Sequence, residues 1–491
     1  MEIKEFFKKR SVIIFSAFII VYLYFAWAFK QYSDVWWDSA SYIGMAKYIF
    51  SNGTLGVFEP MKTVFLPIIL GIFWKLNLNI MFFGNLLIFA AGILSLIFLY
   101  LIAKNLFNKK IANLSIIILF FNILFFVFLF RLYTEIISVC FILGALFFML
   151  KFDENQKYIF LFLSALFSGL SFFNKYTNII IIIPLNLFLL VNLIKHKNAK
   201  SLKQIIMFNI FLLIVLAPFF ILNYKVYNNP MYLFNLSNNY FKENLGHNFD
   251  LRTFPGIPTL FIKNTDFIYF KALLYLFNIM FPFFILGIYF MFKENKNENN
   301  NLLQKDAKEN KMKKIIILIL LPMLIFFLFF EAFYLKQERY IIQIFPLISL
   351  FAAYGLSKLR KSFIIKILVI YIVITLAYSA FYFRATDERS YTNFFKNPNI
   401  NFTCEKAATS DPRSIVSDKV KTLVFPYEVF QDDWTPIYII KEKPDCIFYF
   451  SCSEKRQEQR LLIKSLNYSL EYEKDTGRCL YSIFRYSIFK K

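Results

Sequence analysis

Eleven long apolar runs restrict the folds open to this chain of 491 residues. Each run is roughly 17–25 residues long, the length that an α-helix needs to cross a bilayer. Several are apolar on all sides, whereas a helix of a water-soluble domain is apolar on one face. With 58% hydrophobic residues and a mean hydropathy of +0.53, the chain is predicted to be a polytopic helical membrane protein. The runs lie near residues 11–29, 79–103, 111–130, 132–150, 158–173, 178–194, 204–223, 268–292, 315–334, 339–357 and 363–383.

Basic clusters between these runs predict the topology. The formal net charge is +23, but Lys and Arg gather in short clusters rather than in one basic domain, which argues against a nucleic-acid partner. Six clusters fall at every second junction, and the positive-inside rule makes all six cytoplasmic. The N-terminus is then cytoplasmic and residues 384–491 are extracytoplasmic. The clusters are KEFFKKR, KNLFNKK, KFDENQK, KHKNAKSLK, KENKNENNNLLQKDAKENKMKK and SKLRKS.

The first run has two interpretations. The triplet AWA at residues 26–28 mimics a signal-peptidase site, so the run could be a cleaved signal peptide. An uncleaved anchor is favoured, because cleavage would remove the base of the acidic loop that follows it.

The extracytoplasmic segments predict two domains. Residues 1–383 form the membrane domain, and its first external loop, 30–78, contains two short amphipathic stretches near 38–50 and 62–76 that could lie in the membrane interface. Residues 224–267 form a second loop. The tail, 384–491, has a soluble composition. Its strand-like runs KTLVFPY, PIYII, CIFYF and CLYSIF and its helical stretch EKRQEQRLLIKSL predict a small α/β domain.

Cysteine and histidine usage bears on redox state and metals. Four cysteines lie in the tail, and on the oxidising side of a membrane they allow disulfides in three possible pairings, or they stay unpaired as small hydrophobic residues. They are Cys404, Cys446, Cys452 and Cys479. The two histidines, His196 and His247, have no second His or Cys at ligand spacing, so no zinc motif is visible.

Ionisable residues gather at the predicted external ends of the spans, where charged groups are costly and often functional. Acids and bases at one interface indicate a cavity for a phosphorylated substrate that carries its own lipid. Trp and Tyr beside the carboxylates could stack on a sugar ring or anchor the loop at the headgroups. The charged residues are Asp34, Asp38, Glu59, Lys62, Arg131, Glu135, Lys175, Glu331, Lys336, Glu338 and Arg339.

Such a set fits glycosyl transfer from a polyprenyl phosphate sugar. A carboxylate can take the proton of an acceptor hydroxyl as its oxygen attacks the anomeric carbon. The departing lipid phosphate is anionic, so Arg or Lys can stabilise its charge.

Four segments resemble the GT-C class of membrane glycosyltransferases, especially the branch of protein O-mannosyltransferases and the lipid A aminoarabinose transferase. WWDSASYIGMAKYIFSNG is similar to the family's Asp-Glu-x-x-Tyr motif and the short helix after it. KTVFLPIILGIFWKL resembles the Arg/Lys-Pro-Pro-Leu-Tyr segment. RLYTEI matches an acid at the outer start of the fourth span, and ERYIIQIFPLISLFAAYGL resembles the Arg-Tyr span near the end of the membrane domain. The resemblance covers residues 11–383 and implies a GT-C-like domain of about eleven transmembrane helices.

The resemblance assigns roles residue by residue. Asp38 matches the catalytic acid, here the general base of an inverting displacement. Lys62 and Arg339 match basic residues that contact the lipid phosphate, and Glu135 would orient an acceptor or support the loop. The remaining candidates for substrate binding are Asp34, Trp37, Lys175 and Tyr340.

Two departures from the family pattern bear on metal dependence. Ser39 stands where many relatives have a second acid, and Thr63 and Val64 replace the Pro pair. No cofactor is expected to be required. A divalent metal is possible but not favoured, although Asp34 could replace the missing acid.

Structural alternatives stand beside these roles. Asp38 could cap the helix that follows it, because Asp is favoured at that position. Glu135 could pair with Arg131 one turn earlier. Arg339 could pair with Glu338 or Glu331, and Lys62 could simply extend toward the headgroups.

Other functions compete with sugar transfer. A transporter or flippase of lipid-linked sugars would show internal repeats and charges near the midplane, and neither is visible here. A receptor-like protein with a partner-binding tail leaves the charged span ends without a purpose. A lipid-glycan ligase or polymerase with a pyrophosphate-linked donor stays open. The acceptor is a protein, a lipid or a glycan.

Overall fold

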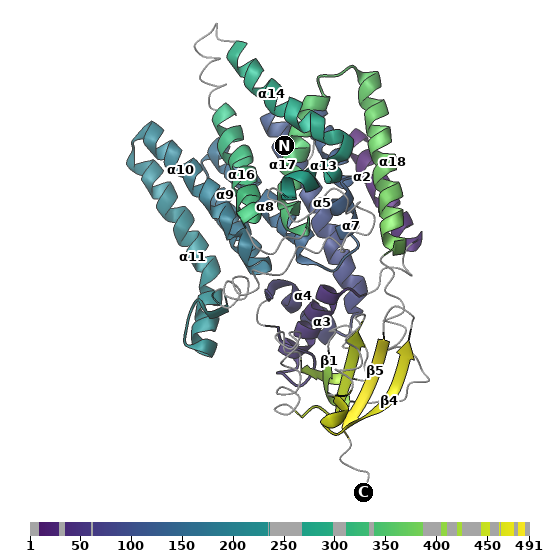
Figure 1. The fold of residues 1–491 in the computed structure, drawn as a ribbon. Coiled ribbons are helices and arrows are strands. Elements are labelled where there is room, and N and C mark those ends of the chain that lie inside the picture. The colour runs from purple at the N-terminus through teal and green to yellow at the C-terminus, as the bar shows by residue number, and fades with distance from the viewer. Residues whose placement is uncertain are drawn as a thin grey trace. The chain divides into compact units, whose positions relative to one another are not determined.

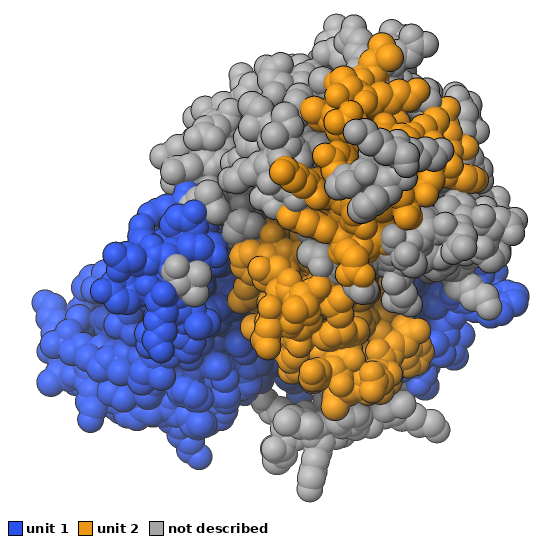
Figure 2. Space-filling model, turned by 90° about the horizontal axis from the view of Figure 1, so that it is seen from below, with its two compact units in different colours: residues 1–30, 87–386 blue, residues 31–86, 387–491 orange. Residues whose placement is uncertain are grey.

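The structure is a computed structural model, and its described residues form two compact units. Unit 1 comprises residues 1–30 and 87–386, and unit 2 comprises residues 31–86 and 387–491 (Figure 2). The domain boundary placed after residue 383 from the sequence stays a prediction. The described residues are 9–28, 35–59, 62–233, 235, 268–297, 311–332, 338–385, 404–409, 420–424, 443–451, 461, 463–475 and 480–486.

Unit 1 is helical, and its helices follow the predicted apolar runs (Figure 1). Within the described residues, eight segments are long and apolar enough to cross a membrane. The predicted all-α polytopic membrane domain is therefore confirmed. Its elements are α2 (Lys9–Ala28), α5 (Ile80–Leu106, which begins in unit 2), α6 (Lys109–Phe120), α7 (Ile123–Phe128), α8 (Thr134–Asn155), α9 (Tyr158–Asn174), η1 (Tyr176–Ile181), α10 (Ile182–His196), α11 (Ala199–Tyr227), α13 (Ile268–Phe277), η4 (Asn278–Met280), α14 (Phe281–Asn297), η5 (Ile316–Leu320), α16 (Leu321–Ala332), η6 (Glu338–Ile344), α17 (Phe345–Leu356) and α18 (Lys361–Ala385).

One predicted span is broken. The run 111–130 forms α6 and α7, separated at Phe121 and Asn122. The Asn122 side chain accepts hydrogen bonds from the first backbone N–H groups of α7, and its amide donates to the Leu276 carbonyl at 3.1 Å. The Thr375 hydroxyl donates to the Phe121 carbonyl at 2.5 Å. A break in an apolar helix needs such partners, because lipid offers none to the freed backbone groups.

The predicted cytoplasmic clusters of unit 1 meet at one end of its helices. Asp153, near the end of α8, pairs with Lys314 at 2.8 Å and accepts a hydrogen bond from Asn192 of α10 at 3.4 Å. Lys110, at the start of α6, donates to the Ser357 carbonyl after α17 at 2.7 Å. This gathering agrees with the predicted alternation of loops. The side of the membrane on which this end lies stays a prediction.

The two short helices predicted in the first external loop are present in unit 2 as α3 (Trp37–Phe50) and α4 (Phe65–Lys75). A turn after α3 contains Gly53 and Gly56, whose φ angles of 82° and 87° favour glycine. The Val57 N–H donates to the Gly44 carbonyl at 3.2 Å, so the chain returns along α3. A Cβ on Gly56 would lie 2.2 Å from that carbonyl oxygen, which leaves no room for a side chain.

The tail contains a five-stranded mixed sheet in the order β2-β1-β3-β5-β4 (Figure 1). Strand β1 is parallel to β2 and β3, whereas β5 is antiparallel to β3 and β4. The runs KTLVFPY, CIFYF and CLYSIF supply β2, β3 and β5 as predicted, while PIYII lies outside the described residues. Helix is present at Leu461 and at 463–465, within the predicted stretch. The strands are β1 (Cys404–Thr409), β2 (Val420–Val424), β3 (Cys446–Ser451), β4 (Tyr468–Asp475) and β5 (Leu480–Tyr486).

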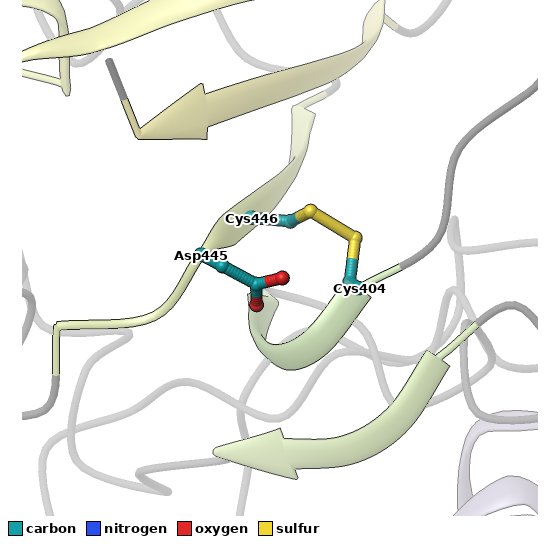
Figure 3. A group of neighbouring side chains, drawn as sticks. All are labelled: Cys404, Asp445 and Cys446. Carbon is teal, nitrogen blue, oxygen red and sulfur yellow. A yellow bond between two sulfur atoms is a disulfide. The ribbon is translucent and has the colours of Figure 1, made fainter. Parts of the chain in front are cut away.

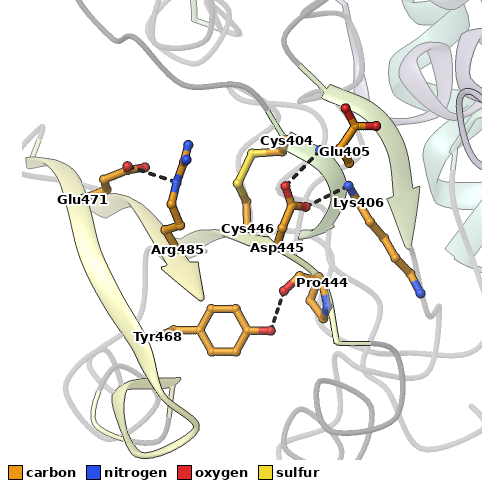
Figure 4. The surroundings of a disulfide bond; sticks show 9 residues. All are labelled: Cys404, Glu405, Lys406, Pro444, Asp445, Cys446, Tyr468, Glu471 and Arg485. Atoms are coloured by element: carbon orange, nitrogen blue, oxygen red, sulfur yellow. Dashed lines mark hydrogen bonds and ion pairs between the residues drawn. A yellow bond between two sulfur atoms is a disulfide. The ribbon is translucent and has the colours of Figure 1, made fainter. Parts of the chain in front are cut away.

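A disulfide between Cys404 and Cys446 joins the neighbouring strands β1 and β3 (Figures 3 and 4). Beside it, the Asp445 carboxylate accepts hydrogen bonds from the backbone N–H groups of Glu405 at 2.9 Å and Lys406 at 2.7 Å. The disulfide and the carboxylate therefore both hold the start of β1 against β3. The other two tail cysteines lie outside the described residues.

Candidate active site

The charged residues singled out in the first loop form a compact group in unit 2, named here the loop cluster: Asp38, Glu59 and Lys62. The Lys62 Nζ atom lies 2.7 Å from Asp38 Oδ1 and 3.3 Å from Glu59 Oε2. It also lies 5.2 Å from the centre of the Tyr42 ring. One ammonium group therefore bridges two carboxylates, one from α3 and one from the segment that returns along it.

The position of Asp38 differs from that of a helix cap. The N-cap of α3 is Trp36, and Asp38 is the second residue of the helix, where a negative charge favours the helix dipole. Its carboxylate points to Lys62 of the returning segment. The close turn at Gly56 makes this meeting possible, because it leads residues 57–59 back along α3.

The two acids of the loop cluster have different environments. The Glu59 side chain is 3% exposed and that of Asp38 is 17% exposed. Burial raises the pKa of Glu59, the Lys62 charge acts in the opposite direction, and the Asp38 charge raises it further. Asp38 is thus the more exposed of the two acids, while Glu59 is buried beside Lys62.

Unit 1 contains a second group, the bundle cluster: Tyr133, Glu135, Lys175, Arg339 and Tyr340. The Lys175 Nζ atom lies 3.3 Å and the Arg339 Nε atom 3.8 Å from Glu135 Oε1. Lys175 Nζ lies 4.6 Å from the centre of the Tyr340 ring, and the Arg339 guanidinium lies 5.1 Å from that of Tyr133. Glu135, Lys175 and Arg339, predicted from three separate spans, therefore meet at one carboxylate.

Three of these side chains lie where a helix begins, ends or changes to a 3₁₀ segment. Glu135 is the second residue of α8, directly after the turn that follows α7. Lys175 follows the last residue of α9, and Arg339 lies in the 3₁₀ segment η6 that leads into α17. The element η6 packs against both α8 and α16. Polar side chains at such ends can leave the apolar helix surface and turn toward one another.

The structure shows contacts of these residues other than the structural alternatives named above. Glu135 pairs with Lys175 and Arg339, while the Arg131 guanidinium lies over the ring of Tyr382 at 5.6 Å. Glu331 accepts a hydrogen bond from the Tyr269 N–H at 2.8 Å, at the start of α13.

Two predicted site residues remain without a described side chain. Asp34 lies outside the described residues, and Trp37 is the first residue of α3 with a side chain outside them. Their predicted roles in substrate binding stay predictions.

Sequence reasoning assigned no role to Tyr133 or Asn174, and it named Glu59 without one. Asn174 is fully buried and donates hydrogen bonds from α9 to α8. An amide at the end of an apolar run, directly before Lys175, was the available signal. No sequence signal distinguished Tyr133, because a Tyr at a span end is common in membrane proteins.

Metal ligands are sparse in the part of the chain that the structure describes. The one close group of His, Cys, Asp or Glu that could hold an ion there is Cys404, Asp445 and Cys446. Its two sulfur atoms form the disulfide, and the Asp445 oxygens accept backbone hydrogen bonds (Figures 3 and 4). This group therefore does not have the free thiolates that a metal needs.

Comparison with known proteins agrees with this architecture. The family model described as dolichyl-phosphate-mannose-protein mannosyltransferase matches residues 60–221. That segment includes Lys62, Glu135 and Lys175. No curated protein sequence matches the chain.

Solved structures of similar fold include two of ArnT from Cupriavidus metallidurans. The apo structure has 12% sequence identity and a TM-score of 0.63, over 95% of this chain and 98% of that one. The structure bound to undecaprenyl phosphate has 10% identity and a TM-score of 0.64, over 97% and 98%. The apo oligosaccharyltransferase from Archaeoglobus fulgidus has 10% identity and a TM-score of 0.50, over 92% and 70%.

At these identities the structural likeness concerns the fold, and it extends over nearly the whole chain. The family match adds a sequence relationship over residues 60–221. Together they confirm the resemblance on which the sequence prediction rested: the chain has the GT-C fold of membrane glycosyltransferases.

Proposed function

We propose that this protein transfers a sugar from a polyprenyl phosphate donor to an acceptor on the external face of the membrane, by direct displacement with inversion and with Asp38 as general base. The observation that carries the proposal is the contact between Lys62 and Asp38 at 2.7 Å. This contact joins Asp38, which one motif assigned as the base, to Lys62, which another motif assigned to the phosphate. The family description names a dolichyl phosphate mannose donor, and the ArnT structure holds undecaprenyl phosphate.

The loop cluster has the charges that this chemistry needs. The Lys62 ammonium favours the ionised carboxylate of Asp38, which is the form that a base must have. Asp38 takes the proton of the acceptor hydroxyl while the hydroxyl oxygen forms a bond to the anomeric carbon. The bond from that carbon to the phosphate oxygen breaks, and the lipid phosphate leaves with the electron pair. Lys62 can stabilise its negative charge.

The bundle cluster has the composition of an anion-binding group. Two cations, Lys175 and Arg339, face one buried carboxylate, Glu135, so the cations outnumber the acids within this cluster. Arg339 can bind phosphate oxygens with its planar fork, and Tyr340 can add an aromatic surface. Glu135 holds both cations in place and can orient an acceptor hydroxyl. We assign this cluster to binding of the phosphorylated donor.

The proposal leaves the acceptor as a protein, a lipid or a glycan, and it requires no cofactor. Asp34 and Trp37 are assigned to the substrate, Trp37 as a surface for a sugar ring. The tail domain, held by its disulfide, belongs to the oxidising external side in this proposal.

The variant Asp38→Asn tests the proposal in membranes supplied with radiolabelled polyprenyl phosphate sugar. It removes the base but keeps the size of the side chain, so sugar transfer should fall while donor binding persists. Transfer at the wild-type rate contradicts the proposal. Loss of lipid-sugar translocation, with no transfer in the wild type, would instead identify a transporter. Transfer from a pyrophosphate-linked donor alone would identify a ligase or polymerase.

A further inference from the structure

We infer that Asn174 is a positioning residue, which sets the place of the Lys175 ammonium by joining the end of α9 to the start of α8. The inference rests on the proposed function in one respect, namely the part that Lys175 plays in donor binding. The placement itself rests on hydrogen bonds of the described residues.

The chain is irregular at this point. Helix α9 ends at Asn174, Lys175 is extended with φ −160° and ψ 115°, and the 3₁₀ segment η1 begins at Tyr176. The end of a helix frees backbone groups, and an apolar surrounding offers them no water. A lysine on one extended residue between two helices could then point in several directions.

Two buried amides hold that residue from both sides. The Asn174 amide nitrogen donates to the Thr134 carbonyl at 2.7 Å and to the Ser138 hydroxyl at 2.8 Å, both on α8. The Asn178 amide donates to the Ser171 carbonyl at 3.2 Å, in the last turn of α9. Both asparagines are fully buried. The backbone on either side of Lys175 is therefore attached to packed helices.

The attachment acts on both partners of the ion pair. Thr134, whose carbonyl accepts from Asn174, directly precedes Glu135, and Lys175 directly follows Asn174. Glu135 and Lys175, which directly follow the two hydrogen-bonded residues, are thus the two members of the ion pair at 3.3 Å. A lysine side chain loses much rotamer entropy when it is held in place, and a fixed backbone origin reduces the directions that it can take. Asn174 consequently favours the position in which Lys175 meets Glu135 and the Tyr340 ring.

A spectroscopic experiment tests the placement without any activity. Lysines of the purified protein are reductively methylated with ¹³C, and the Lys175 signal is assigned by its absence in Lys175→Arg. Because Lys175 Nζ lies 4.6 Å from the centre of the Tyr340 ring, we expect its methyl signal to carry a ring-current shift. Asn174→Ala should remove most of that shift, and Ser138→Ala should reduce it, since one of two acceptors remains.

The matched control is Asn209→Ala. Asn209 of α11 donates to Asn186 of α10 at 2.8 Å, so this variant also loses an amide hydrogen bond between two helices, but one whose partner is not ionisable. It should leave the Lys175 signal unchanged. An unshifted signal in Asn174→Ala together with a wild-type signal in Asn209→Ala supports the inference. A wild-type signal in Asn174→Ala overturns it.

A double-mutant cycle then connects placement with function. Asn174→Ala should raise the KM for the donor about fivefold to tenfold, the effect of one or two lost hydrogen bonds, with little change in kcat. In a Lys175→Ala background the same change should have no further effect on KM, because its target is gone. An equal effect in both backgrounds overturns the inference and indicates general loss of packing. A wild-type KM in Lys175→Ala alone contradicts the proposed donor site, while the spectroscopic result still decides the placement.

Discussion

The loop cluster and the bundle cluster contain the same kinds of side chain in opposite proportions. In the loop cluster one cation, Lys62, lies between the carboxylates of Asp38 and Glu59. In the bundle cluster one carboxylate, Glu135, lies between the cations of Lys175 and Arg339. The loop cluster thus contains two acids and one basic residue, and the bundle cluster one acid and two basic residues.

In the proposed function, this difference separates two tasks of a transferase that uses an anionic donor. A base must accept a proton, which an excess of carboxylate favours. A phosphate must be bound where positive charge is left over after internal pairing. The central residue of each cluster, Lys62 or Glu135, keeps the outer two in place despite their mutual repulsion. The following predictions would break or sharpen this division.

The largest effect is expected from exchanging the charges of one pair. The double variant Asp38→Lys with Lys62→Asp keeps an ion pair between α3 and the returning segment but has no base at position 38. We expect sugar transfer to fall about 10²–10⁴-fold, the usual contribution of a general base. Initial rates with labelled donor measure this, and a thermal unfolding midpoint near that of the wild type shows that the fold persists. A double variant that regains the activity lost in Asp38→Asn would make the pair structural and not catalytic.

A smaller effect is expected when the bundle cluster loses a cation. Lys175→Met removes one charge-assisted contact to the donor phosphate, and we expect KM for the donor to rise about 10-fold to 100-fold. The matched control is Lys314→Met, since Lys314 pairs with Asp153 at the opposite end of the same helix, α8. Donor titrations of initial rates compare the two variants. Equal increases in KM would mean that the bundle cluster has no special affinity for the donor.

The turn that closes the loop cluster should matter less than its charges. Gly56→Ala places a side chain at a φ of 87° and a Cβ at 2.2 Å from the Gly44 oxygen, so the returning segment must move. Backbone strain of about 1–3 kcal/mol and a displaced Lys62 should lower transfer by roughly tenfold. The control Gly53→Ala has a similar backbone strain, at a φ of 82°, but its new Cβ meets only the flexible Tyr48 side chain at 3.3 Å, so the two variants differ in the clash with the Gly44 carbonyl. A comparable loss in both variants would indicate general sensitivity of the turn.

The smallest effect concerns pH and Glu59. Burial raises the pKa of Glu59 above its ordinary value of 4.5, so the folded protein binds this proton more tightly than the unfolded chain. Stability should therefore fall as the pH rises from about 4.5 toward the pKa of the folded state. Glu59→Gln should flatten this part of the profile of unfolding temperature against pH. The control is Glu473→Gln, which removes an exposed acid. An unchanged profile in Glu59→Gln would show that Glu59 is ionised in the folded protein.

Much of the membrane domain followed from local sequence pattern. A span needs only a sufficient length of apolar residues, which any window of the chain displays. The break in the run 111–130 was not visible, because its buried polar groups find partners on α13 and α18, far away in sequence. Strands β1 and β4 were missed since CEKAAT and YSLEYEKD lack the apolar character of the other strands. They are strands because neighbours in the sheet supply their hydrogen bonds.

The chain alone determined that charged side chains collect at the ends of apolar helices, because residue type and helix length are local properties. Family resemblance then named Asp38, Lys62, Glu135 and Arg339. Only the tertiary structure decided which of them are partners. Lys175 meets Glu135 of another helix, at the place where a buried hydrogen bond from Asn174 joins α9 to α8. Pairing depends on how helices pack, and packing is a property of contacts between distant segments that no single stretch of sequence contains.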